Sequence, residues 1–169
     1  MHLPGNRAIV TVLAFICLVA AVQPANAIKM IHNTGGYSIE LKLLNAEAFG
    51  TGMPGMSQGH RGMVMVATGG ANAVQVDDPS HPNHHLVIDV HDAASHKIVT
   101  NADVSISFTL VDASGKPVGP ATRIPIVIMQ ASDKGVASTH YGNNVTMPSG
   151  SYLIDVTVNG VNTTFRLKT

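Results

Sequence analysis

Residues 152–167 read YLIDVTVNGVNTTFRL, and this stretch decides the fold class. Apolar and polar residues alternate from Tyr152 to Val158 and again from Val161 to Leu167, the period-two pattern of strands that bury one face. Asn159-Gly160 separates the two runs, and this dipeptide is typical of a two-residue type I′ turn, in which both residues take a positive φ. The stretch therefore predicts an antiparallel β-hairpin.

The same alternation appears earlier in the chain, at residues 39–43 and 104–110. Turn-forming residues cluster at 112–117 and at 148–150. The sequence contains no amphipathic helical pattern of useful length. About seven short strands separated by frequent turns favour an all-β fold, an antiparallel β-sandwich of immunoglobulin-like type.

The composition favours a single domain and gives no electrostatic reason for a nucleic-acid partner. The chain has 169 residues, with 10 basic and 10 acidic side chains. A neutral balance does not attract a polyanion, so we expect no nucleic-acid binding. The polar residue choice is more informative, because 9 His and 8 Met accompany only those 10 carboxylates.

The first 27 residues have the pattern of a signal peptide. Arg7 precedes an apolar run over residues 8–22, and Ala25-Asn26-Ala27 supplies the small residues of a cleavage site. The run is shorter than the about 20 residues of a membrane-spanning helix. We expect cleavage after Ala27, a periplasmic location and a mature domain over residues 28–169. The single cysteine lies in the removed part, which leaves neither a disulfide nor a thiolate metal site.

Residues 84–91, HHLVIDVH, carry the densest group of metal-ligand side chains. On a strand, the apolar side chains of this segment face the core, while His85, Asp89 and His91 share the opposite face. Imidazole and carboxylate together suit first-row divalent ions, and a carboxylate can also orient a ligating histidine. The alternative is a solvated sheet face whose histidines have no role.

A second group of candidate ligands lies in a glycine- and methionine-rich loop over residues 49–62, which contains Met53, Met56 and His60. Thioether sulfur is a soft ligand that prefers Cu(I), and it is the only soft ligand in the mature chain. The two methionines directly after the loop alternate with valines, which favours packing over metal binding.

The order of several short motifs resembles one family, the periplasmic ferrous-iron-transport proteins that bind copper. The motifs are His85-Leu86-x-x-Asp89-x-His91, an apolar strand with Met129, Ala131-Ser132-Asp133, and His140-Tyr141-Gly142-x-Asn144-Val145. The resemblance covers residues 84–158. It implies an exported immunoglobulin-like β-sandwich that forms a homodimer, takes part in high-affinity iron uptake and has an inner-membrane metal permease as its partner.

The resemblance also implies a metal site formed by His85, Met129 and His140. The sequence departs from the family at Val87, where the family has an acidic residue, and in a longer spacing between the methionine and the second histidine. The family's later histidine-containing segment does not follow before Thr169. These differences remove a carboxylate and an imidazole.

The missing ligand is expected from one of four residues: His84, Met53, Met56 or His60. Asp89 and His91 then either orient the ligands from behind or belong to a second site. Two imidazoles and a thioether accept Cu(I) and Cu(II), and the Irving–Williams order favours copper over Fe(II), so we expect copper first and ferrous iron second.

The sequence therefore predicts a non-enzymatic metal-binding protein that acts in metal uptake, delivery or tolerance. A strand face bearing His85, Val87 and His91 is the expected contact surface of a homodimer. One alternative is an exported adaptor or structural module that binds another protein and whose histidines are incidental. Another is an enzyme that uses bound copper or iron for redox chemistry.

Overall fold

The computed structural model describes residues 27–46, 63–68, 83–131 and 134–169. The predicted signal peptide (its last residue, Ala27, excepted) and the glycine-rich loop, with the candidate ligands Met53, Met56 and His60, lie outside these ranges. The described strands are β1 (Ile28–Thr34), β2 (Tyr37–Asn45), β3 (Met63–Thr68), β4 (His84–Asp92), β5 (Val104–Val111), β6 (Thr122–Ile124), β7 (Val127–Ala131), β8 (His140–Val145), β9 (Ser151–Val158) and β10 (Val161–Lys168), with one short 3₁₀ helix, η1 (Gly135–Ser138).

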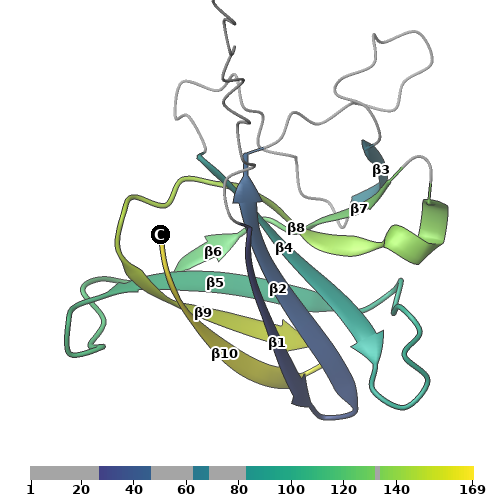
Figure 1. The fold of residues 1–169 in the computed structure, drawn as a ribbon, viewed down its shortest axis with the longest axis horizontal. Coiled ribbons are helices and arrows are strands. Elements are labelled where there is room, and N and C mark those ends of the chain that lie inside the picture. Colours follow the sequence, from purple (N-terminus) through teal and green to yellow (C-terminus); the bar gives the residue numbers. More distant parts are fainter. Residues whose placement is uncertain (1–26, 47–62, 69–82, 132–133) are drawn as a thin grey trace, which may run out of the picture.

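These strands form two sheets, and each strand pair within them is antiparallel. The larger sheet has the order β1-β2-β4-β8-β7-β3, and the smaller has the order β10-β9-β5-β6. Figure 1 shows the strands of the smaller sheet crossing those of the larger at a steep angle. The predicted all-β antiparallel sandwich is confirmed. No helix among the described residues is long and apolar enough to span a membrane.

The hairpin of β9 and β10 forms as its sequence predicts. Val158 pairs with Val161 and Tyr152 with Leu167. The turn residues Asn159 and Gly160 have φ values of 47° and 81°, the positive angles that a type I′ turn requires.

The core lies between the two sheets and takes alternate residues from each. On β4, the side chains of Leu86, Ile88 and Val90 are fully buried, as the alternation predicts. They belong to one cluster that includes Ile154 of β9 and Phe165 of β10. Each such side chain contributes about 1.5–3 kcal/mol on burial. The other face of β4 points away from this cluster and carries His85, Asp89 and His91.

One glycine sets the spacing of β4 and β8. A Cβ on Gly142 would lie 1.9 Å from the carbonyl oxygen of Leu86, a backbone atom that cannot move aside. Gly142 pairs with Val87 on one side and with Val127 of β7 on the other. The close approach of these strands therefore depends on the absence of a side chain here.

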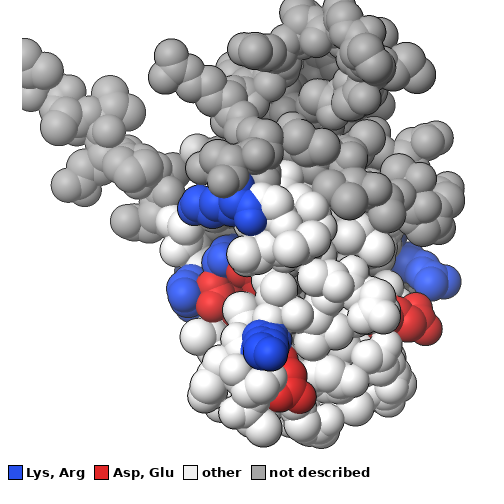
Figure 2. Space-filling view, turned by 90° about the vertical axis from the view of Figure 1, so that its right-hand side faces the viewer, with Lys and Arg blue, Asp and Glu red and all other residues white. Residues whose placement is uncertain are grey.

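Charged side chains are few on the face of the molecule shown in Figure 2, and those of opposite sign lie near one another. Such mixing produces no extended field of one sign on this face.

Candidate metal site

The site lies on the face of the larger sheet that points away from the main core, where β4, β8 and β7 are neighbours. His85 of β4 pairs with Asn144 of β8, and His140 of β8 pairs with Met129 of β7. Directly opposed residues of antiparallel strands project to the same side, and residues two apart on one strand do as well. His85, Asn144, His140 and Met129 therefore share one face.

The two imidazoles meet across that face. Their ring centroids are 6.4 Å apart and the rings are nearly perpendicular, at 88°. Gly142 lies between Asn144 and His140 on β8 and contributes no side chain. Bonds of about 2.0–2.1 Å to nitrogen would place two rings on one ion with centroids roughly 5–6 Å apart. The observed separation of 6.4 Å lies slightly above this range.

Met129 is as deeply enclosed as the histidines. The exposed fractions of His85, Met129 and His140 are 0%, 1% and 8%. The main core cluster does not include these residues, so they form a second buried patch. Their burial corrects one expectation, because the strand face bearing His85 and Val87 was predicted to be an exposed contact surface and both residues are buried.

Both imidazoles are oriented through Nδ1. His140 Nδ1 lies 2.8 Å from the carbonyl oxygen of Ser138, and His85 Nδ1 lies 3.0 Å from Oδ1 of Asn144. Each contact oxygen accepts a hydrogen bond, so each neutral ring carries its proton on Nδ1 and its lone pair on Nε2. The Nε2 atom of His140 is buried and has no hydrogen-bond partner among the described residues, which is costly unless a ligand compensates it.

His85 is neutral at pH 7. Burial lowers the pKa of His85 to about 4; the positive charge that His140 can carry adds to the lowering, and the hydrogen bond with Asn144 opposes it. Metal ligation requires the neutral imidazole, and this ring is already in that form.

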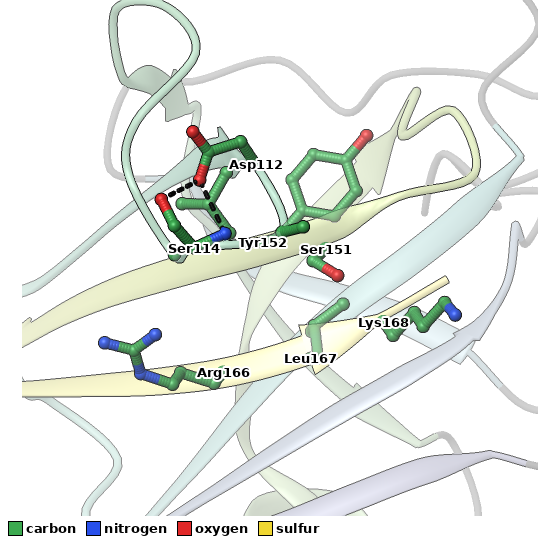
Figure 3. Close-up of a pocket in the computed structure, with 10 residues that line it drawn as sticks. Asp112, Ser114, Ser151, Tyr152, Arg166, Leu167 and Lys168 are labelled. Carbon is green, nitrogen blue, oxygen red and sulfur yellow. Dashed lines mark hydrogen bonds between the residues drawn. The ribbon is translucent and has the colours of Figure 1, made fainter.

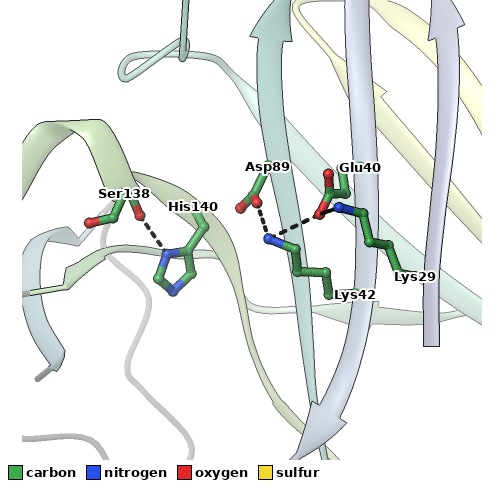
Figure 4. Close-up of polar contacts among 6 residues, drawn as sticks. All are labelled: Lys29, Glu40, Lys42, Asp89, Ser138 and His140. Atoms are coloured by element: carbon green, nitrogen blue, oxygen red, sulfur yellow. Dashed lines mark hydrogen bonds and ion pairs between the residues drawn. The ribbon is translucent and has the colours of Figure 1, made fainter. Parts of the chain in front are cut away.

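The segment between β7 and β8 is held by buried polar contacts that fix the start of β8. Gln130 Nε2 donates to Thr139 Oγ1 at 2.9 Å, and Thr139 Oγ1 donates to the carbonyl oxygen of Val136 at 2.8 Å. These bonds close the turn around η1 and set the Ser138 carbonyl beside the His140 ring, as Figure 4 shows.

Asp89, predicted to support the ligands or to belong to a second site, lies in a different group of contacts. Lys42 Nζ forms ion pairs with Asp89 and, at 3.0 Å, with Glu40; Lys29 Nζ is also 3.0 Å from Glu40. Figure 4 shows Lys42 between the two carboxylates, while His140 turns to Ser138 instead.

The remaining predicted ligands on β4 lie apart from the imidazole pair. His91 Nδ1 is 3.3 Å from the carbonyl oxygen of His96, at the far end of the strand. His84 is adjacent to His85 in sequence, so it projects to the opposite face of the sheet.

Sequence reasoning missed two residues that shape the site, although both stand in the quoted motif: Asn144, which contacts His85, and Gly142. The register makes Met65 of β3 the direct partner of Met129, and the packing role of the methionines after the loop stays a prediction.

The donor set limits the chemistry. Among the described residues, no three His, Cys, Asp or Glu side chains are placed to hold one metal ion. Met129, the strand partner of His140, offers a thioether, which is a soft ligand suited to copper.

A separate cavity on the smaller sheet is lined by other kinds of side chain than the candidate metal site. A cavity of about 430 Å³ is lined by the turn after β5 and by β9 and β10, including Asp112, Ser114, Arg166 and Lys168. Figure 3 shows the Asp112 carboxylate accepting hydrogen bonds from Ser114, which stabilise that turn. No histidine or methionine lines the cavity, and none of the predicted ligands contributes to it.

Comparisons with known proteins support the fold. No family model matches the chain, and no curated protein matches it in sequence. Among solved structures, the chain is similar to a copper-bound variant of FetP from a uropathogenic Escherichia coli strain. That match has a TM-score of 0.51 and 16% sequence identity, and it covers 84% of this chain and 95% of the FetP chain. The two proteins share the β-sandwich architecture.

Proposed function

We propose that this protein binds copper on the outer face of its larger sheet, with His85, Met129 and His140 as ligands. The observation that carries the proposal is the meeting of two buried imidazoles, each with Nδ1 bonded to an oxygen, beside a buried methionine. The copper bound to the structurally similar FetP variant supports the choice of metal.

The ligand chemistry favours Cu(I). A thioether contributes little to a site for Fe(II), which prefers nitrogen and oxygen donors, whereas Cu(I) accepts two imidazoles and a thioether. The carboxylate nearest in sequence to the imidazoles, Asp89, is held by Lys42, so it does not supply the oxygen that iron would favour. Met53, Met56 and His60 remain proposed as sources of a further ligand.

Titration calorimetry with Cu(I), Cu(II) and Fe(II) on the mature domain tests the proposal. We expect copper to bind tighter than micromolar and Cu(I) to bind tightest. His85→Ala and His140→Ala should each abolish that binding, whereas His32→Ala, at an exposed contact with Thr163 on another strand, should leave it unchanged. Binding of every metal weaker than micromolar contradicts the site, and a preference for Fe(II) contradicts the choice of copper.

The cellular role belongs to the same proposal. The protein acts in the periplasm after cleavage following Ala27, as a non-enzymatic carrier in metal uptake, delivery or tolerance, with a homodimeric state and an inner-membrane metal permease as partner. Mass spectrometry of the exported protein should find Ile28 at its amino terminus. An adaptor with incidental histidines would instead keep its protein partner in the His85→Ala and His140→Ala variants.

A further inference from the structure

The side chain of Asn144 contacts Nδ1 of the His85 ring. This side chain is an amide, which can present either a hydrogen-bond acceptor or a donor to the ring. Asn144 lies directly across from His85 on β8, and its side chain is 2% exposed. Its Oδ1 atom is 3.0 Å from Nδ1 of His85. The contact is therefore buried and short, at the ring atom opposite to the proposed metal-binding nitrogen.

An amide has an oxygen that accepts and a nitrogen that donates, so the end facing the ring decides the ring's tautomer. When Oδ1 faces Nδ1, the imidazole carries its proton on Nδ1 and offers a lone pair at Nε2. When the NH₂ group faces Nδ1, the proton moves to Nε2 and that atom is no longer a ligand. We infer that Asn144 is a positioning residue that holds His85 in the Nδ1–H tautomer and so makes its Nε2 a copper ligand. This inference rests on the proposed function.

The second imidazole has no such dependence. His140 Nδ1 is bonded to the Ser138 carbonyl, a backbone group that only accepts. Its tautomer follows from the backbone, whereas that of His85 follows from the identity of residue 144. A substitution at this one position should therefore change one ligand of the site and leave the other in place.

The neighbouring asparagine orders the strand around this contact. Asn143 Nδ2 donates to the carbonyl oxygen of Pro125 at 3.0 Å, which fixes the orientation of that amide, and Asn143 Oδ1 accepts from the backbone N–H of Asn144 at 2.9 Å. Asn143 is buried on the opposite side of β8, across from Leu86. It provides a matched control of the same residue type on the same strand.

Two substitutions separate the amide's roles. Asn144→Asp keeps the shape and presents only acceptor atoms, so the Nδ1–H tautomer is retained and copper should bind as tightly as in the wild type or tighter. Asn144→Leu keeps a similar volume and removes the acceptor, so we expect copper affinity to fall about 10–100-fold, the usual effect of losing an outer-shell partner. Asn143→Leu should lower stability and leave the tautomer of His85 unchanged.

The decisive measurement is ¹⁵N NMR of the imidazole nitrogens in metal-free protein, since each tautomer has its own chemical shifts. Wild type and Asn144→Asp should show His85 protonated at Nδ1, and Asn144→Leu should show the Nε2–H form, which free imidazole side chains favour in water. Where Asn144→Leu does not fold, Asn144→Ala replaces it.

The possible outcomes distinguish this inference from the proposed function. An Nε2–H form of His85 in the wild type overturns the inference, as does an unchanged tautomer after removal of the acceptor. If the tautomers respond as expected and copper does not bind to the wild type, the role of Asn144 in setting the ring stands and the copper proposal fails.

Discussion

The outer face of the larger sheet has two halves, which differ in the polar side chains that they carry and in how those side chains are paired. The charged half, on β1, β2 and β4, carries Lys29, Glu40, Lys42 and Asp89, which pair with one another. The histidine half, on β4, β8 and β7, carries His85, His140, Asn144 and Met129, and the structure buries all four. Both halves belong to one sheet and share β4.

The difference between the halves shows which of them suits a cation. In the charged half, every carboxylate already has an ammonium group, so a metal ion would have to displace a lysine. In the histidine half, each ring is bonded through Nδ1 to an oxygen, so a metal ion at Nε2 would not have to displace a lysine. The half with fewer charges is therefore the better metal site.

The largest effect on stability and copper binding is expected when a side chain is added where β4 and β8 approach closely in the histidine half. Gly142→Ala places a Cβ 1.9 Å from the Leu86 carbonyl oxygen, so β4 and β8 must separate. We expect a loss of about 3 kcal/mol or more in the free energy of unfolding, at or above the usual range for overpacking, together with loss of copper binding. Urea unfolding monitored by circular dichroism measures the first effect.

Gly119→Ala is the matched control for that experiment. No atom lies within 4 Å of a Cβ built on Gly119, so its free energy of unfolding should change by no more than about 0.5 kcal/mol. Equal stability of the Gly142 and Gly119 variants would show that the strands tolerate a side chain at their closest approach.

The second largest effect is expected from replacing Met129, which should weaken Cu(I) binding and leave the fold intact. Met129 and Met147 are both buried, with exposed fractions of 1% and 0%, and Met147 belongs to the main core cluster. Met→Leu conserves volume and typically costs less than about 1.5 kcal/mol at either position. Met129→Leu should lower Cu(I) affinity more than about 100-fold, because even outer-shell partners contribute 10–100-fold.

Met147→Leu should leave Cu(I) affinity unchanged, and competition with a colorimetric Cu(I) chelator measures both variants. A similar affinity in the two variants would mean that Met129 has a packing role, which is the role that its position after an apolar run would otherwise indicate.

Alternation and turn chemistry made much of the fold predictable from the sequence. The β9–β10 hairpin, the buried side of β4 and the all-β class follow from local patterns that the structure confirms. Burial of the histidine face did not follow, because the alternation that places His85, Asp89 and His91 on one face is the same whether that face is open or covered. His85 is nevertheless fully buried, which the alternation alone does not indicate.

The contacts of the site were harder still to predict. His85 and Asn144 are 59 positions apart, and only the register of β4 on β8 makes them neighbours. The sequence grouped Asp89 with the histidines because of its spacing, and the register of β2 on β4 brings Lys42 to it instead. Alternation gives the face of a side chain, whereas register gives its partner.

The smallest effect should appear in the charged half and depend on pH. Burial raises the pKa of Glu40, but the hydrogen bonds and charges of Lys29 and Lys42 outweigh burial and hold the pKa below its usual value. A lowered pKa means that Glu40 stabilises the fold above the pKa of the unfolded chain, about 4.3. This contribution is lost as the pH falls through the lower pKa of the folded state.

Glu40→Gln should therefore reduce the free energy of unfolding by up to about 1 kcal/mol at pH 7, and the difference from wild type should shrink below about pH 4.3, where the unfolded chain takes up its proton. Urea titrations at several pH values measure this, and 1 M salt should diminish the difference at pH 7. Copper affinity at pH 7 should stay unchanged, because Glu40 pairs with Lys29 and Lys42 in the charged half and lies outside the histidine half. A difference that persists unchanged to pH 3, or a loss of copper binding in this variant, would show that the two halves of the face are not independent.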